Sequence, residues 1–415
     1  MQSCANDVKS GVGGEDVGIG VLITGVAPEG VGEGTAVAFA SQRPKNLLLV
    51  SRTPQKIEAV ASSIRAQYPE VSVKVIIMDL ASQISIRKAA AAVAEVIDTL
   101  DILINNAGAT YNHRQWTAEG IEIQFGTNHI GPFLFTKLLF PLLEAAARSS
   151  PPGSTRIINL SSNGHRLSPV RFHDYNFEGK EIPEEERPFP NLRPAFAKVH
   201  DDGYMPTIAY AQSKTANVLF TVYLQKHLKS RGIASYAVHP GSVITHLGRQ
   251  HDEETANAIS KVSDYWKTVD EGAATSLVAA LDPKLSECRG LYMSNCQLTD
   301  AADFGKDYEI AKRLWHLSEE LVGEKFTIDL VRRGTIMIAK KNALTACGAG
   351  GIGEALVREF QCRNLHVFAT ARSQSKLGFG RGPLERDVPI LGLTSSESTA
   401  AAVAAVSKET GGTLD

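Results

Sequence analysis

The sequence predicts an α/β fold with a doubly wound parallel sheet of about seven strands. Short apolar runs recur through roughly the first 300 residues, and each run is continuous rather than alternating, which indicates strands buried on both faces. Helical segments separate these runs, a pattern typical of βαβ units and a parallel sheet. Right-handed crossovers would then place the helices on both faces of the sheet.

The expected strands and helices alternate in chain order. The strands are Val21–Ile23, Asn46–Val50, Val73–Met78, Leu100–Ile104, Arg156–Leu160, Ala234–Val238 and Gly290–Met293. The helices run from a glycine-rich turn through about Ala40, then over segments that include Ser85–Asp98 and Ala209–Ser230.

One connection, Arg166–Ile208, is too long for a simple turn, and it is polar and proline-bearing. Long loops in compact domains tend to be functional lids or disordered. We expect this loop to contribute to a substrate pocket, the alternative being a solvent-exposed decoration. Its aromatic residues are Phe172, Tyr175, Phe177, Phe189, Phe196 and Tyr204.

The composition indicates an ordinary globular protein and excludes several classes. The formal net charge of -2 provides no basic field for nucleic acid and no polybasic membrane signature. The 5 cysteines are widely spaced, which favours reduced thiols and a cytoplasmic location. We expect no membrane span, because no stretch of eighteen apolar residues is evident, and no metal site, because the histidines lack ligand spacing on one helix.

A second strand-turn-helix pattern begins after about Leu330 and repeats the first. Thr345–Gly353 lines up with Thr24–Gly32, Ala371–Ser373 with Ser51–Thr53, and Thr413–Asp415 with Thr99–Asp101. We therefore predict a flexible leader over 1–17, a catalytic domain over 18–330, and a truncated, non-catalytic second half over 331–415. Because half a sheet exposes strand edges, this second half would be docked on the first domain, poorly folded, or the product of a truncated gene model.

The turn Thr24–Gly32 follows a strand and opens a helix, the context in which glycines let a backbone approach a pyrophosphate. Arg52 follows the second strand, where an acidic residue would bind a ribose, so a 2′-phosphate and NADP(H) are favoured over NAD; the alternative is a solvated surface arginine. Asp79 is placed to contact adenine or to cap the next helix. The turn also carries Glu29 where a glycine is common, and a carboxylate there weakens phosphate binding unless it points away.

Tyr210 and Lys214 are four residues apart on a predicted helix and therefore share one face. A lysine ammonium beside a phenol favours the phenolate, so Tyr210 would exchange a proton with an alcohol or carbonyl. By itself this pair would be interpreted as part of an amphipathic helix surface.

The whole set of motifs resembles the short-chain dehydrogenase/reductase family over about residues 18 to 330. Phe125–His129, Tyr210–Lys214 and Gly272–Thr275 resemble its retinol-dehydrogenase-like and WW-domain-oxidoreductase-like branch. The motifs are Thr24–Gly25 with Gly30 and Gly32, Asp79, Asn105–Gly108, Asn128, Ser161–Ser162, Tyr210 with Lys214, and Pro240–Gly241.

The resemblance implies a Rossmann-type fold and a role for each motif. Tyr210 would be the general acid/base, Lys214 would lower its pKa and hold the nicotinamide ribose, and Ser162, rather than Ser161, would polarise the carbonyl. Asn128 would support a water-linked proton relay. The implied cofactor contacts are Thr24, Gly25, Gly30, Val31, Gly32, Ser51, Arg52, Asp79, Leu80, Asn106, Ala107, Gly108, Tyr210, Lys214, Pro240, Gly241, Val243 and Thr245.

The expected function is that of an NADP(H)-dependent oxidoreductase that interconverts an alcohol and a ketone or aldehyde. The substrate would be a lipophilic or secondary-metabolite-like small molecule, and the protein a homodimer or homotetramer. One alternative is a non-catalytic NADP-binding redox sensor or scaffold on the same fold. Another is a structural partner whose C-terminal segment mediates association. The presence of all four catalytic residue types favours the enzyme.

Overall fold

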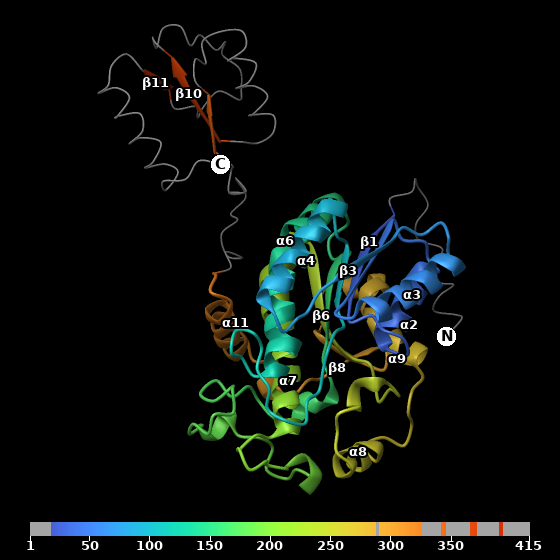
Figure 1. The fold of residues 1–415 in the computed structure, drawn as a ribbon, viewed down its shortest axis with the longest axis vertical. Coiled ribbons are helices and arrows are strands. Elements are labelled where there is room, and N and C mark those ends of the chain that lie inside the picture. Colours follow the sequence, from blue (N-terminus) through green and yellow to red (C-terminus); the bar gives the residue numbers. More distant parts are fainter. Residues whose placement is uncertain (1–17, 288–289, 326–341, 346–365, 372–389, 393–415) are drawn as a thin grey trace. The chain divides into compact units, whose positions relative to one another are not determined.

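The structure, a computed structural model, describes residues 18–287 and 290–325, together with the backbone of three short strands further along the chain (Figure 1). The chain divides into two compact units, 1–329 and 330–415. The predicted leader and most of the predicted second half lie outside the described residues.

The first unit contains an eight-stranded sheet in the order β3-β2-β1-β4-β5-β6-β7-β8. Every neighbouring pair is parallel except the last, β7–β8, which is antiparallel. This confirms the predicted fold class and adds an eighth strand, which lacks the buried apolar run that marks the others. The strands are β1 (Gly20–Thr24), β2 (Asn46–Ser51), β3 (Val73–Ile77), β4 (Ile102–Asn105), β5 (Thr155–Leu160), β6 (Ile233–His239), β7 (Tyr292–Ser294) and β8 (Gln297–Thr299).

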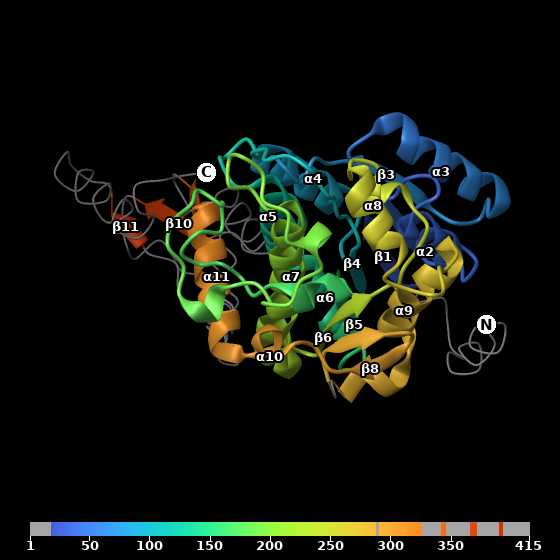
Figure 2. The same cartoon turned by 90° about the horizontal axis from the view of Figure 1, so that it is seen from below.

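Helices cover both faces of this sheet (Figure 2). One face carries α2 (Val31–Ala40), α3 (Pro54–Gln67) and α9 (Val269–Leu281), and the other carries α4 (Gln83–Val96), α6 (Gly131–Ser149) and α7 (Pro206–Leu228), with α11 (Tyr308–Val322) packed on α7. Shorter helices are α5 (Ile123–Phe125), α8 (Glu253–Ser260) and α10 (Asp303–Lys306). The π-helix η2 spans Gly126–Ile130, and the 3-10 helices are η3 (Asn163–Leu167), η4 (Glu184–Glu186), η5 (Pro194–Phe196), η6 (Lys229–Arg231), η7 (His246–Gly248) and η8 (Pro283–Glu287).

The strand residues point alternately into two hydrophobic clusters. In β1, Val21 and Ile23 pack with α2, α3 and α9, whereas Leu22 packs with α4, α6 and α7. All three side chains are fully buried. Burial of such a side chain contributes about 1.5–3 kcal/mol, so the continuous apolar runs stabilise both helical layers.

The sheet order reverses direction between β1 and β4, which lie side by side. In a doubly wound sheet, ligands bind at the carboxyl ends of the strands next to this switch point. The glycine-rich turn follows β1 and the Asn105–Gly108 segment begins at the end of β4, so the topology brings these two motifs together.

The helical run Ile123–Ser149 is long and apolar enough to cross a membrane, by length and composition. We predicted no such stretch from the sequence. More than half of its apolar window is buried inside the protein, because α6 packs against the sheet and α4. The core helix of a globular protein passes the same test.

In the second unit, β9 (Asn342–Thr345), β10 (His366–Ala371) and β11 (Ile390–Gly392) form a parallel sheet in the order β11-β10-β9. The residues between these strands lie outside the described part, including the predicted second glycine turn after Thr345. The interpretation of this unit as a truncated, non-catalytic repeat therefore stays a prediction.

Candidate active site

A cleft of about 990 Å³ opens at the carboxyl ends of the central strands. All of the residues predicted to contact the cofactor line it, and so do Ser162, Tyr210 and Lys214 among the four predicted catalytic residues. Asn128 is not among its lining residues. The sequence motifs therefore converge on one site, although they come from the ends of six strands and from helix α7.

The floor of the cleft after β1 is a close approach of two backbones. Gly25 has φ 74°, and a Cβ there would lie 2.5 Å from the Cα of Ala107. At Gly32 a Cβ would meet the carbonyl oxygen of Gly25 at 2.6 Å. Gly30 is the N-cap residue of α2, so the N-terminus of this helix faces the cleft and offers unpaired N–H groups to an anion.

The segment after β4 is hydrogen-bonded to this turn. Asn106 Nδ2 donates to the carbonyl oxygens of Thr24 at 2.8 Å and Gly25 at 3.2 Å, and the N–H of Ala107 donates to Thr24 Oγ1 at 3.1 Å. Asn105 Nδ2 donates to Asn159 Oδ1 on β5 at 2.9 Å. Asn105 thus bonds the end of β4 to β5, and Asn106 bonds the segment after β4 to the turn after β1.

Glu29 points across the mouth of the cleft. Its backbone has φ 59°, and its carboxylate Oε2 lies 2.8 Å from Nε2 of His246 in η7. The neighbouring residue of η7, Leu247, accepts a 2.9 Å hydrogen bond from Thr110 through its carbonyl oxygen. Both contacts join the loop after β6 to the cofactor side of the cleft, and they leave the Glu29 carboxylate at the rim.

The cleft wall after β2 is basic. Arg52 and Lys56 both line it, and the Arg52 guanidinium hydrogen-bonds Tyr111, with Asp79 close enough to act on it electrostatically. These contacts raise the pKa of Arg52, with the Tyr111 hydrogen bond as the main cause. Sequence reasoning missed Lys56 and Tyr111: Lys56 is hidden among the ordinary charges of α3, and Tyr111 has no pattern of its own.

Ser162, Tyr210 and Lys214 meet at the centre of the cleft. The Ser162 hydroxyl hydrogen-bonds the Tyr210 phenol, and Lys214 Nζ lies 5.5 Å from the centroid of the Tyr210 ring. Lys214 is buried and donates to the Leu160 carbonyl oxygen at 3.2 Å. A Cβ at Gly108 would come within 3.1 Å of Lys214 Nζ, so the glycine leaves room for this side chain.

The adjacent Ser161 has a different part. Its hydroxyl donates to the main-chain carbonyl of Lys214 at 2.8 Å, within a buried contact. Both serines line the cleft, but the Ser161 hydroxyl is used to join β5 to α7, whereas the Ser162 hydroxyl hydrogen-bonds Tyr210.

Burial sets the protonation of this centre. It raises the pKa of Tyr210 to about 12, and the Ser162 hydrogen bond opposes that rise. Burial also lowers the pKa of Lys214 to about 8. Desolvation is thus the largest influence on both groups, and the lowering of the Tyr210 pKa that we predicted from Lys214 does not occur in this structure.

Asn128 lies behind the cleft, in the π-helix η2, and is completely buried. Its Nδ2 donates to the Ala109 carbonyl oxygen at 2.9 Å and to Ser213 Oγ at 3.0 Å, and its Oδ1 accepts from the Ala109 N–H at 2.8 Å. Both ends of the amide hold the chain beyond Gly108. A proton relay through Asn128 stays a prediction, and π-helical turns are frequent at functional sites.

A buried network that the sequence did not reveal ties α5 to the start of α7. Glu122 is fully buried and accepts from Tyr204 Oη at 2.7 Å and from the Phe125 N–H at 2.7 Å. Gln124 Nε2 donates to Tyr204 Oη at 2.8 Å and to the Pro206 carbonyl oxygen at 3.0 Å. Burial raises the pKa of Glu122 to about 7. This network fixes the start of the helix that carries Tyr210 and Lys214.

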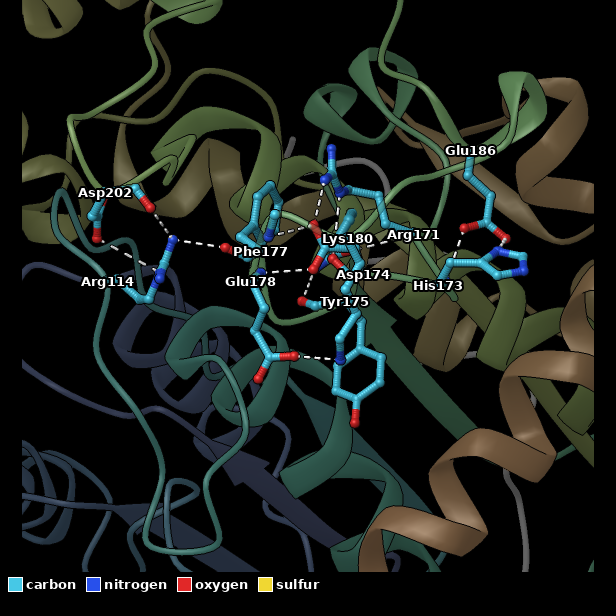
Figure 3. A network of polar contacts seen from close by, with 12 residues as sticks. Arg114, Arg171, His173, Asp174, Tyr175, Phe177, Glu178, Lys180, Glu186 and Asp202 are labelled. Carbon is cyan, nitrogen blue, oxygen red and sulfur yellow. Dashed lines mark hydrogen bonds and ion pairs between the residues drawn. The ribbon is translucent and has the colours of Figure 1, made fainter.

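The long connection between Ser162 and α7 is held by ion pairs (Figure 3). Arg171 pairs with the buried Asp174 at 2.9 Å, and the buried Glu186 contacts His173 at 2.9 Å and Arg313 of α11 at 3.1 Å. Of the loop's six aromatic residues only Phe196 lines the cleft, while Phe177 and Tyr204 are buried in a small core of their own. The loop therefore contributes fewer aromatic residues to the cleft than we predicted.

Two loops contribute several apolar residues to the lining of the cleft. The segment around η5 packs against α8, and Lys198 pairs with Asp252, the N-cap of α8, at 2.6 Å. The apolar lining residues in and near these loops are Leu167, Phe196, Leu247, Ile259, Val262 and Trp266, and the polar ones include Arg249 and His251.

Comparisons with known proteins agree with this site. Residues 20–176 match the family described as short chain dehydrogenase. Human Retinol dehydrogenase 13 is 35% identical over 308 residues, which cover 73% of this chain and 84% of that protein. Oxidoreductase fscI of Fusarium equiseti is 37% identical over 240 residues, covering 57% of this chain and 92% of that protein. A solved structure of an uncharacterized protein from Mycobacterium paratuberculosis is 28% identical, covers 74% of this chain and 94% of that chain, and has a TM-score of 0.52.

The chain therefore belongs to the short-chain dehydrogenase/reductase family. Within this family it is retinol-dehydrogenase-like, which confirms the resemblance seen in the motifs. Members of the family are oxidoreductases that use nicotinamide cofactors. Among the residues that the structure describes, no group of three or more His, Cys, Asp or Glu side chains is arranged to hold a metal ion.

Proposed function

We propose that this protein is an NADP(H)-dependent oxidoreductase that interconverts an alcohol and a ketone or aldehyde on a lipophilic or secondary-metabolite-like substrate. The observation that carries the proposal is the meeting of Ser162, Tyr210 and Lys214 in a cleft that also holds the phosphate-binding turn. A cytoplasmic location without a membrane span, and a homodimeric or homotetrameric assembly, belong to the same proposal.

The three side chains suit proton transfer to a carbonyl. A bound nicotinamide would exchange a hydride with the substrate carbon. With a pKa of about 12, the Tyr210 phenol carries its proton at neutral pH and can donate it to the carbonyl oxygen. Ser162 would hydrogen-bond the same oxygen, and protonated Lys214 would stabilise the phenolate left behind.

The choice of NADP(H) is supported by the basic wall after β2. Arg52 and Lys56 supply two positive charges where a 2′-phosphate of the adenosine ribose would lie, and no carboxylate occupies the end of β2. The lipophilic substrate is supported by the apolar side chains that two loops contribute to the cleft, among them Phe196, Leu247 and Trp266.

The test is NADPH oxidation by the full chain against aldehydes and ketones of increasing chain length, with NADH and Tyr210→Phe in parallel. We expect turnover with NADPH, much weaker turnover with NADH, and a loss of roughly 100-fold or more in the Tyr210 variant. Tight NADPH binding without turnover on any substrate would favour the sensor or scaffold alternative instead.

A further inference from the structure

His165 is a completely buried histidine in η3, three residues after Ser162. Its Nδ1 lies 2.6 Å from the carbonyl oxygen of Ser162, and the backbone N–H of Ala302 points to its Nε2 at 3.0 Å. A carbonyl oxygen only accepts a hydrogen bond and a backbone N–H only donates one. Nδ1 therefore carries the ring proton and Nε2 carries none, so two backbone groups hold the imidazole neutral and in one tautomer.

The contact with His165 completes a set of bonds that fixes Ser162 on every side. The Ser162 carbonyl oxygen also accepts from the backbone N–H of His165 at 3.0 Å. The Ser162 Oγ accepts from the N–H of Gly164 at 3.1 Å, which leaves its hydroxyl hydrogen to face Tyr210. A serine hydroxyl otherwise rotates to suit its surroundings, so these bonds select the rotamer that serves the site.

His165 also joins three elements around the active centre. The His165 carbonyl oxygen accepts from Thr215 Oγ1 at 2.8 Å, and Thr215 follows Lys214 in α7. The imidazole packs on Tyr292 of β7 with 4.8 Å between the ring centroids. Ala302 lies just before α10, so the second ring nitrogen reaches a segment 137 residues away in the chain.

We propose that His165 is a positioning residue for the proposed reaction: as a neutral imidazole protonated at Nδ1, it holds the main chain of Ser162 so that the Ser162 hydroxyl faces Tyr210. This inference rests on the proposed oxidoreductase function. His165 itself would touch neither substrate nor cofactor, and it acts through Ser162.

Two conservative variants separate the two ring contacts. His165→Asn places an amide N–H near Nδ1 and keeps the bond to Ser162, but it loses the acceptor for Ala302. His165→Gln reaches the position of Nε2 and keeps the acceptor for Ala302, but it loses the bond to Ser162. Each variant therefore serves as the control of the other at the same buried site.

The measurement is kcat, KM and the NADPH dissociation constant of both variants, with melting temperatures. We expect His165→Asn to keep kcat within about threefold and His165→Gln to lose roughly tenfold, the effect of one misplaced hydrogen bond. NADPH affinity should stay within about twofold in both. If kcat falls equally in the two variants, or only in proportion to the melting temperature, His165 only stabilises the fold and the proposal fails.

A readout without turnover keeps the two proposals distinguishable. If the wild-type chain turns over no substrate of the panel, the proposed function fails on its own. Nitrogen NMR of the histidine rings, with the His165 signals assigned by their loss in His165→Gln, tests the tautomer in either case. We expect a proton on Nδ1 and none on Nε2 down to about pH 5, since burial lowers the pKa of His165 to about 4. A proton on Nε2, or an ordinary titration near neutral pH, would overturn the inference.

Discussion

The cofactor end of the cleft is shaped by backbone, whereas its substrate end is shaped by side chains from separate loops. At the cofactor end, an added Cβ at Gly25 or Gly32 would lie within 2.6 Å of neighbouring backbone atoms, and Asn106 is hydrogen-bonded to the main chain of the turn. At the substrate end, Phe196 and Trp266 come from loops whose positions depend on ion pairs such as Lys198–Asp252. Changes at the first end should therefore be severe and general, and changes at the second end mild and substrate-selective.

The strongest test of this contrast is Gly25→Ala. A Cβ at φ 74° would lie 2.5 Å from the Cα of Ala107, so the turn or the β4 segment must shift. We expect the NADPH dissociation constant to rise roughly 100-fold and the melting temperature to fall, because overpacking of a rigid backbone contact costs about 1–3 kcal/mol and strain at positive φ adds to it. Fluorescence titration and thermal unfolding measure the two effects.

Gly120→Ala is the matched control for this variant. Gly120 has a similar φ of 78°, but a Cβ there would meet nothing within 4 Å. It should lose only about 1 kcal/mol of stability and leave NADPH binding unchanged. Equal effects of the two alanines would mean that the close approach to Ala107 does not matter.

A smaller effect is expected from Arg52→Ala, which removes a side chain but leaves the backbone of the cofactor end intact. NADPH should bind roughly tenfold more weakly, since a charge-assisted hydrogen bond contributes about 1.5–3 kcal/mol and this side chain is exposed to water. NADH affinity should hardly change. Calorimetric titration measures the affinity for each cofactor. An equal loss of affinity for NADPH and NADH would contradict a 2′-phosphate contact at Arg52.

The pKa values of Tyr210 and Lys214 predict how the rate of carbonyl reduction depends on pH. Burial lowers the pKa of Lys214 to about 8, so its ammonium is lost as the pH rises through that value, whereas Tyr210 with a pKa of about 12 keeps its proton. Carbonyl reduction should then decline above about pH 8, toward tenfold per pH unit, because the phenolate left by proton donation loses its counterion. In Lys214→Arg the guanidinium stays charged, and the decline should move above pH 10. An unchanged inflection in this variant would assign it to another group.

The cofactor end is built from local backbone turns and the rest of the site from residues far apart in the chain, and this difference explains what the sequence could predict. Glycines and asparagines that build a backbone turn must occupy fixed positions near each other in the chain, so the phosphate site and the Tyr210–Lys214 pair were recognisable. The Glu122–Tyr204 bond joins residues 82 positions apart, and no local pattern announces it. The short strand β8 was not predicted either, because it is exposed and contains no buried apolar run.

At the substrate end, Phe196→Ala should act only on large substrates. Removal of an apolar surface that lines the cleft would raise the KM of a long-chain aldehyde roughly fivefold, and leave a short-chain aldehyde and NADPH affinity unaffected. Phe189→Ala is the control in the same loop, since Phe189 is 53% exposed and does not line the cleft. Equal KM values for wild type and Phe196→Ala across chain lengths would place the substrate elsewhere.

The smallest effect is expected at Glu29, which places a charged side chain at a cofactor end that is otherwise formed by backbone. This residue has φ 59°, a conformation that favours glycine, and its carboxylate lies at the rim of the phosphate site beside His246. Glu29→Gly removes a negative charge near the cofactor phosphates and relieves the backbone, so NADPH should bind about threefold more tightly at low salt.

Glu29→Gln provides the control, because it removes the charge but keeps the strained backbone and a side chain that can still reach His246. If charge repulsion dominates, both variants gain affinity and the gain shrinks as salt is raised. If the contact with His246 instead holds η7 over the cleft, Glu29→Gly weakens NADPH binding while Glu29→Gln does not. The sign of the change in Glu29→Gly therefore tells whether this rim opposes the cofactor or encloses it.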